Sequence, residues 1–294
     1  MSAIKSYFKQ EINPRMFKIE HQKPADFYLS NWQTTRSAVP LLILRVVLLL
    51  ASLTIVLSSL ITYIVKGKFR FWFIYLTHWG LTSILLATSF AVAVSARIYL
   101  RGPISGEYNL PWYVKIFWVL CNIATPFAFL ITVFYWTVLY SAGMEEEVNH
   151  TLDVAVHGIN SIIMFLLLLS SSLPVRLLHI YQPLLFGITY MLFGLFYYLG
   201  GGIDRLGNPY IYSVIDWSKP GTTVVVLLIT GILLILLHFF TTALAVARDA
   251  GTARCFRKSQ TVKPAEGMPL RQPEQVETWW KNTRKADPRC WDRA

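Results

Sequence analysis

Six long apolar blocks restrict what this chain of 294 residues can fold into. Each has about 20 or more mainly apolar residues, the length that an α-helix needs to cross a hydrocarbon core roughly 30 Å thick. Backbone groups in lipid must form hydrogen bonds within their own segment, so such blocks are helices. The sequence therefore predicts an all-α, polytopic membrane helix bundle with six transmembrane helices. The blocks are Pro40–Val65, Phe71–Ile98, Tyr113–Ser141, Leu152–Leu173, Tyr181–Gly201 and Thr222–Ala247.

The blocks divide the chain into three regions. Residues 1–39 form a basic segment, residues 40–250 hold the six helices, and residues 251–294 form a basic tail that we expect to be disordered. Because no apolar run precedes Pro40, we expect no cleavable signal peptide, and the first span would itself direct insertion.

The net charge of +11 is placed as in a membrane protein. The basic residues lie in the two tails and in short loops between apolar blocks, where cations set the orientation of the spans. Membrane lipid is therefore the expected partner, and no nucleic acid is expected. Arg97, Arg101, Arg176 and the two tails together predict that both termini are cytoplasmic. The basic run Lys66–Arg70 would lie on the outer side and so opposes this orientation, but the two tails carry more positive charge and outweigh it.

Two positions are candidates for modification. Asn149 begins the glycosylation sequon Asn149-His150-Thr151 on the predicted outer side, although it lies so close to a span that it can also stay unmodified. Cys255 follows the sixth span among basic residues, so it is either a palmitoylation site or an unmodified thiol. The sequence contains 3 cysteines, and these do not form a disulfide framework.

Ionisable residues within the blocks are the first candidates for a functional site, because they are costly in lipid and usually face the bundle interior. We expect Arg45 to extend to the nearby cytoplasmic surface in a structural role. His238 is expected to be a packed or interfacial histidine. The remaining ionisable and neutral polar candidates are His78, Asp153, His157, Thr77, Asn122, Thr125 and Asn160.

Thr77, Asp153 and His157 form the best candidate for a catalytic site. Thr77 and His157 both lie on the order of 8–10 Å below the predicted outer boundary, so they can meet if their helices are neighbours. Asp153 precedes His157 by one helical turn and can orient its imidazole. Thr77 would then be the nucleophile and His157 its base. The alternative is that these polar residues only hold helices together.

A metal site is a rival interpretation of the fourth block. His150, Asp153 and His157 form an i, i+3, i+7 row of ligand types that zinc uses. No metalloprotease motif accompanies the row, and we predict no metal or other cofactor. The sequence also lacks a phosphate-binding loop, a serine elbow, an internal repeat and the paired broken helices of many transporters.

Several motifs between about residues 25 and 250 resemble those of the rolling stone family of animal membrane proteins. The resemblance implies a multi-pass plasma-membrane protein. The founding member is associated with myoblast fusion during muscle development, which implies a role in cell–cell fusion or development. The motifs are Val156-His157-Gly158-Ile159-Asn160, Leu173-Pro174-Val175-Arg176, Tyr181-Gln182-Pro183-Leu184, Phe196-Tyr197-Tyr198-Leu199-Gly200-Gly201-Gly202 and Tyr210-Ile211-Tyr212-Ser213-Val214-Ile215-Asp216-Trp217.

The pattern is more distantly similar to the androgen-induced gene product family of six-span proteins. Members of that family hydrolyse fatty acid esters of hydroxy fatty acids with an intramembrane threonine and histidine, which correspond to Thr77 and His157. The resemblance implies an alternative function, a threonine/histidine hydrolase of a lipid ester. The chain departs from that family at Val154, where the first histidine of Asn-His-x-x-His is missing, and Tyr210-Ile211-Tyr212 only loosely matches Trp-Val-Tyr-Pro.

Overall fold

The computed structural model describes residues 11–33, 37–104, 109–140 and 150–256. Its described part is built from helices, and six of them are long and apolar enough to cross a membrane, by length and composition. The predicted all-α class and the six spans are confirmed. The spans are Val39–Val65, Leu76–Arg101, Trp112–Leu139, His150–Ser170, Leu177–Leu199 and Pro220–Ala253.

The first three spans follow one another with one short helix between the first two. They comprise α2 (Val39–Val65), the short α3 (Phe69–Trp72), α4 (Leu76–Arg101) and α5 (Trp112–Phe134). The third span continues beyond α5 as the π-helical segment η3 (Tyr135–Leu139).

The fourth span also contains a π-helical segment. It comprises α6 (His150–Val154), the π-helical η4 (Ala155–Ile159) and α7 (Asn160–Ser170). The fifth span is the 3₁₀ turn η5 (Leu177–Ile180) followed by α8 (Tyr181–Leu199), and the sixth is α9 (Pro220–Phe256). Residues 251–256, predicted to belong to the tail, are therefore helical.

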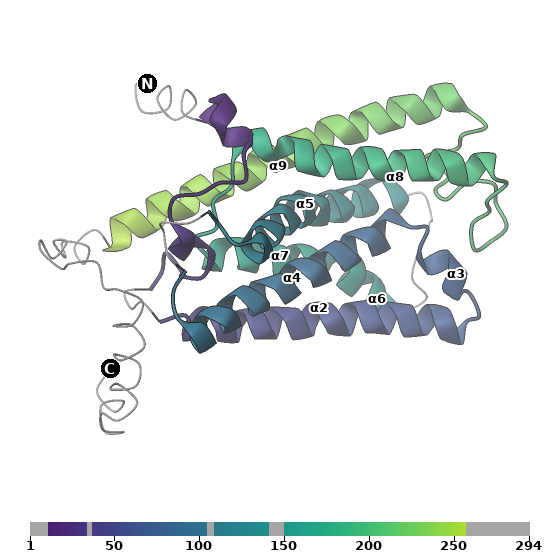
Figure 1. The fold of residues 1–294 in the computed structure, drawn as a ribbon. Helices are drawn as coiled ribbons and strands as arrows, with labels where there is room; N and C mark the ends of the chain where they lie inside the picture. Colours follow the sequence, from purple (N-terminus) through teal and green to yellow (C-terminus); the bar gives the residue numbers. More distant parts are fainter. Residues whose placement is uncertain (1–10, 34–36, 105–108, 141–149, 257–294) are drawn as a thin grey trace, which may run out of the picture. The chain divides into compact units, whose positions relative to one another are not determined.

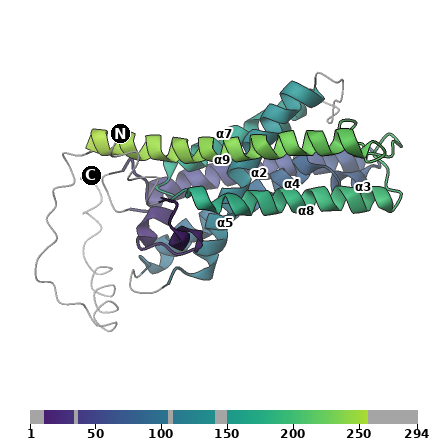
Figure 2. The ribbon, with the colours of Figure 1, turned by 90° about the horizontal axis from the view of Figure 1, so that it is seen from above.

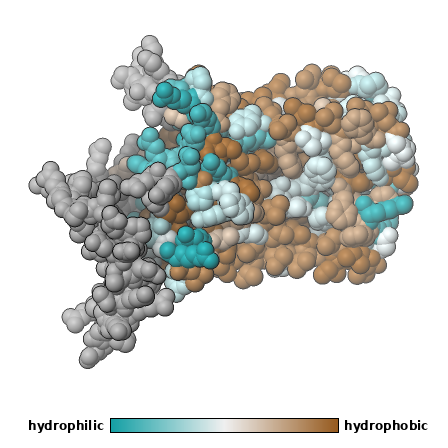
Figure 3. Space-filling model, viewed as in Figure 1, coloured by the Kyte–Doolittle hydropathy of each residue, from teal (hydrophilic) through white to brown (hydrophobic). Residues whose placement is uncertain are grey.

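Helix α5 lies in the middle of the bundle, in contact with α4, α7, α8 and α9 (Figures 1 and 2). The helices α2 and α4 pack together on one flank, and α8 and α9 lie on another. Apolar side chains cover much of the outer face along the helices (Figure 3). Leu185 on α8 is 63% exposed and Leu228 on α9 is 62% exposed, as expected of side chains that contact lipid.

The second span begins at Leu76 rather than at the predicted Phe71. The imidazole of His78 stacks on Trp72 with ring centroids 4.6 Å apart, and its Nδ1 lies 2.6 Å from the Trp72 carbonyl oxygen. These contacts stabilise a break between α3 and α4, and they give His78 a structural role. Thr77 consequently lies in the first turn of α4, not deeper within a continuous helix.

Residues 11–33, which we call the N-terminal strap, pack against one end of the bundle. The strap contains the 3₁₀ turns η1 (Pro14–Phe17) and η2 (Pro24–Phe27). The Trp32 indole donates a hydrogen bond to the carbonyl of Leu169 (2.7 Å), and Asn31 Nδ2 donates to Asp249 Oδ1 (2.7 Å). The strap and the C-terminal part of α9 therefore lie at the same end of the bundle, the strap end (Figure 1).

Arg45 is fully buried, so the prediction that it extends to the surface is wrong. Its Nη1 donates hydrogen bonds to the Ala91 carbonyl (3.1 Å) and to Ser95 Oγ (2.7 Å). Its Nη2 donates to the Phe27 carbonyl (2.8 Å), and the guanidinium lies 5.0 Å from the ring centroid of Phe117. The Phe27 carbonyl of the strap thus gives the guanidinium a buried hydrogen-bond acceptor, and the Arg45 side chain does not need to reach the surface.

Candidate functional site

Two π-helical segments, η3 and η4, lie on spans that contact each other. A π-turn inserts an extra residue into a helix and often occurs at functional sites. Tyr135 is the first residue of η3, and His157 lies in the middle of η4. Their rings stack with centroids 3.5 Å apart and an interplanar angle of 5°. The two irregular segments thus bring a phenol and an imidazole into direct contact.

The predicted contact between Asp153 and His157 is confirmed. His157 Nδ1 lies 3.1 Å from Asp153 Oδ1 and 3.0 Å from the carbonyl oxygen of the same residue. The Tyr135 hydroxyl donates a hydrogen bond to Asp153 Oδ2. All three side chains are buried. We call Tyr135, Asp153 and His157 the Tyr–Asp–His cluster, and Tyr135 is its member that sequence reasoning missed.

Thr132 on α5 holds η4 in place. Its hydroxyl donates a hydrogen bond of 2.6 Å to the carbonyl of His157, and it lies 2.7 Å from the hydroxyl of Ser161. Ser161 in turn donates to the carbonyl of Ala128 at 2.8 Å. These contacts join the third and fourth spans and fix the backbone that carries His157.

Replacing Thr132 with valine is expected to destabilise the folded bundle by about 1–3 kcal/mol, because the change keeps the shape of the side chain but removes the hydrogen bond to the part-buried carbonyl of His157. Thermal unfolding of the purified protein in detergent measures this. Thr54→Val is the matched control, since the exposed Thr54 hydroxyl bonds to the carbonyl of Leu50 on its own helix. Equal losses in the two variants would contradict the role assigned to Thr132.

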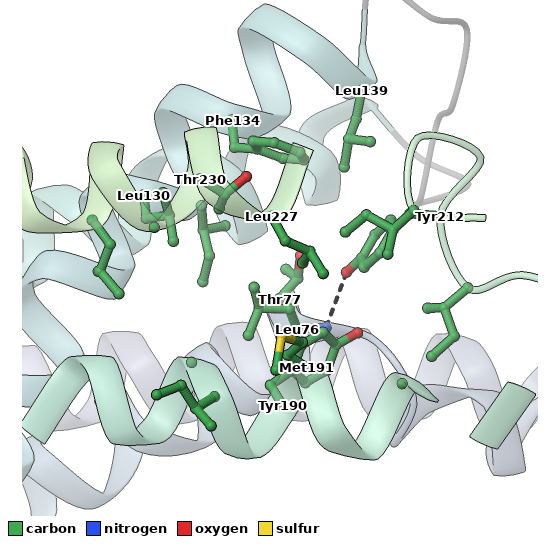
Figure 4. Close-up of a pocket in the computed structure, with 18 of the residues that line it drawn as sticks. Leu76, Thr77, Leu130, Phe134, Leu139, Tyr190, Met191, Tyr212, Leu227 and Thr230 are labelled. Atoms are coloured by element: carbon green, nitrogen blue, oxygen red, sulfur yellow. Dashed lines mark hydrogen bonds between the residues drawn. The ribbon is translucent and has the colours of Figure 1, made fainter. Parts of the chain in front are cut away.

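A cavity of about 180 Å³ lies beside this cluster, between α5, α8, α9 and the first turn of α4. Figure 4 shows Thr77 and Thr230 on its wall together with mainly apolar side chains. Tyr212, from the loop between α8 and α9, accepts a hydrogen bond from the backbone N–H of Leu76 (2.9 Å) and so joins this loop to the start of α4. The loop forms part of the cavity wall.

Carboxylates shape that loop rather than face the cavity. Asp204 Oδ1 accepts hydrogen bonds from the N–H groups of Leu206 and Asn208, each at 2.8 Å. Asp216 Oδ1 accepts from the hydroxyl (2.7 Å) and the N–H (3.0 Å) of Ser218. The hydrogen bond from the Ser218 side chain is the main reason that the pKa of Asp216 lies below its ordinary value. Both acids therefore stabilise turns.

The three predicted catalytic residues have different relations to the cavity. Thr77 lines it, and helix α4 contacts η4, so the second and fourth spans are neighbours, the condition under which Thr77 and His157 can meet. Within the described part of the chain, Tyr135 and not His157 is the member of the Tyr–Asp–His cluster on the cavity wall. The phenol thus connects the buried Asp153–His157 pair with the space that Thr77 faces.

The zinc-type row receives no support from the structure. His150 is exposed at the start of α6, whereas Asp153 and His157 are buried. Among the described residues, no three histidine, cysteine, aspartate or glutamate side chains form a group able to hold a metal ion.

Other predicted polar residues have packing roles near the strap end. Asn122 Nδ2 on α5 donates hydrogen bonds to His179 Nδ1 (2.9 Å) and Gln182 Oε1 (3.0 Å). His238 Nε2 on α9 lies 3.1 Å from the carbonyl oxygen of Arg176, as expected of a packed histidine. These contacts connect the third, fifth and sixth spans.

The side chains of both modification candidates lie outside the part of the chain that the structure describes. Asn149 lies outside the described residues. The backbone of Cys255 is in the last turn of α9, and its side chain lies outside what the structure describes.

Comparison with known proteins identifies the family. The family described as Protein rolling stone matches residues 2–262 of this chain. Protein rolling stone of Drosophila melanogaster is 28% identical over 241 residues, which cover 79% of this chain and 86% of that protein. No solved structure matches the chain significantly. Because the match extends over all six spans, the chain belongs to the rolling stone family.

Proposed function

We propose that this protein acts at the plasma membrane in cell–cell fusion or in development, with both termini in the cytoplasm. The observation that carries the proposal is the family match over residues 2–262, which includes the loops as well as the spans. The hydrogen bond between Asn31 and Asp249 supports a common side for the two ends, because it joins the strap to the C-terminal part of α9. Basic tails favour the cytoplasmic side.

Depletion of the protein in its native tissue tests the role. Fewer fused cells or disturbed membrane organisation is expected, with recovery on re-expression of the wild-type chain. Epitope tags at the two ends should react with antibody only after permeabilisation, and the protein should be labelled by surface biotinylation. Unchanged fusion and membrane organisation after depletion, or retention in an internal membrane, would count against the proposal.

A second proposed function is hydrolysis of a lipid ester inside the membrane, and one observation favours it. Most serine and threonine hydroxyls on the spans, such as Thr230 on Val226, bond to a carbonyl one turn back. Thr77 lies in the first turn of α4, where the backbone one turn back is not helical, and its side chain faces the cavity. The Thr77 hydroxyl is thus placed to form a hydrogen bond with a ligand in the cavity rather than with a carbonyl of its own helix.

In this reaction the Thr77 hydroxyl attacks the ester carbonyl and forms a new C–O bond, and the ester C–O bond then breaks. His157 accepts the threonine proton through Tyr135 and Asp153, because the Tyr135 hydroxyl donates to Asp153 Oδ2 and Asp153 Oδ1 lies 3.1 Å from His157 Nδ1. The same path returns the proton to the departing alcohol, and Asp153 also orients the imidazole. Water then cleaves the acyl-threonine. The positive end of the α4 dipole stabilises the negative charge that develops on the carbonyl oxygen.

The test is release of fatty acid from a branched lipid ester by the purified protein, together with labelling by a serine/threonine-hydrolase probe. Thr77→Ala is expected to abolish both, and His157→Ala to lower the rate by about 10²-fold or more. Thr230→Val is the control, because it removes the other threonine hydroxyl on the cavity wall. If Thr77→Ala and His157→Ala keep wild-type activity, the protein is not this hydrolase.

A further inference from the structure

The cavity beside Thr77 is long and parallel to the helices. Its wall extends along α8 from Leu184 to Tyr198, which corresponds to about 20 Å of helix at 1.5 Å per residue. On α5 and η3 it extends from Phe127 to Leu139, about 18 Å by the same rise. A volume of about 180 Å³ spread over such a length describes a narrow slot. An apolar cavity of about 150 Å³ can already hold benzene, so this slot is large enough for an apolar ligand.

The slot is apolar at its deep end and carries hydroxyl groups at the other. Phe127, Leu130 and Leu234 form a separate buried apolar cluster at the deep end. The end beneath the loop between α8 and α9 has the hydroxyl-bearing residue Thr77 (Figure 4). Tyr135, at the start of η3 and about two turns beyond Phe127, also lines the wall. No charged side chain or histidine belongs to the wall within the described residues. Such a slot suits a hydrocarbon chain with an uncharged oxygen group at one end.

Glycines keep the slot open. In membrane helices glycine usually permits close packing against a neighbouring helix. A Cβ atom at Gly231 on α9, however, would meet no atom within 4 Å, although this residue lines the cavity. On α8, a Cβ atom at Gly187 or Gly194 would make only ordinary contacts, 3.5 Å from Phe127 and 3.8 Å from Trp217. These glycines therefore leave space instead of closing it.

The two helices that form one side of the slot are also the two spans most exposed to lipid. Large apolar side chains of α8 and α9 point outward, among them Ile188 (49% exposed), which also lines the cavity. Acyl chains of the bilayer run parallel to these helices and lie directly outside them. A lipid chain therefore needs to move only past this pair of helices to enter the slot.

We propose that the cavity binds one acyl chain of a neutral lipid, with the ester or hydroxyl oxygens of the lipid at Thr77 and Tyr135. The inference goes beyond the proposed functions, because binding requires neither membrane fusion nor hydrolysis. The absence of cations from the described wall excludes a phosphate head group from the slot.

The probe for this site is a monoalkyl glycerol ether that carries a photoreactive diazirine in its chain. An ether is not hydrolysed, so binding is measured separately from any esterase activity. In the purified full-length protein, label is expected on residues of the cavity wall, such as Phe134, Tyr190 and Met191. Label confined to lipid-facing side chains such as Leu185 and Leu228 would overturn the proposal.

Gly231→Leu fills the slot and is expected to reduce labelling at least tenfold. Gly251→Leu is the matched control, because it lies on the same helix, has equally open space at its Cβ and is not part of the wall. An unlabelled neutral monoacylglycerol should compete at least tenfold better than a single-chain phospholipid. Equal labelling of the two variants, or equal competition by the phospholipid, would overturn the proposal even if the wild-type protein proves to be an esterase.

Discussion

Replacing Arg45 with methionine is expected to release part of the N-terminal strap and to destabilise the bundle by about 3 kcal/mol or more. The guanidinium donates to the carbonyls of Phe27 and Ala91 and to the Ser95 hydroxyl, all away from water. Each buried acceptor that loses its donor costs about 1–3 kcal/mol. Methionine fills similar space and removes the cost of burying a charge, which offsets only part of this loss.

The measurements for Arg45→Met are thermal unfolding in detergent and hydrogen exchange of the strap. Exchange of the backbone amides around Phe27 should become faster than in the wild type. Arg97→Met is the control, because Arg97 is on α4 and, among the described residues, donates a single, longer hydrogen bond of 3.3 Å to the Gly102 carbonyl. Unchanged exchange around Phe27 would mean that other contacts, such as the Trp32 hydrogen bond to Leu169, are sufficient to hold the strap.

The six spans were predictable because length and apolarity are local properties of the sequence. The exact helix ends were not, since they depend on side chains that bond to backbone groups. The start of α4 is one case, where the contacts of His78 with Trp72 accompany a break inside an apolar run. Burial of Arg45 is another, because the acceptor at Phe27 belongs to a segment with no span-like pattern.

The candidate site was predictable only within one helix. Asp153 and His157 are four residues apart, so helical geometry alone brings them together. Tyr135 and Thr132 come from a different span, and no spacing in the sequence relates them to His157. The π-turns that bring the two rings together depend on these contacts between spans, which a single helical repeat cannot reveal.

The second large effect on stability is expected from a substitution of Gly80, where α4 packs against α5. A Cβ atom on Gly80 would lie 2.3 Å from Cδ1 of Ile131, so even one added carbon requires this side chain to move. Gly80→Leu adds four carbons at one of the two most extensive interhelical contacts of the bundle. We expect a loss of about 3 kcal/mol or more, because overpacking a close-packed core forces side chains and backbone out of their preferred positions.

A second substitution at Ile131 shows whether this loss arises from the contact itself. Ile131→Ala alone should cost about 2–5 kcal/mol by leaving a cavity, yet in the Gly80→Leu background it should restore stability by making room for the leucine. Gly231→Leu serves as the control for leucine in place of a helical glycine, and it should be tolerated because its Cβ meets open space. If the double variant is less stable than Gly80→Leu, or if Gly231→Leu is equally damaging, the close approach of α4 and α5 is not what Gly80 provides.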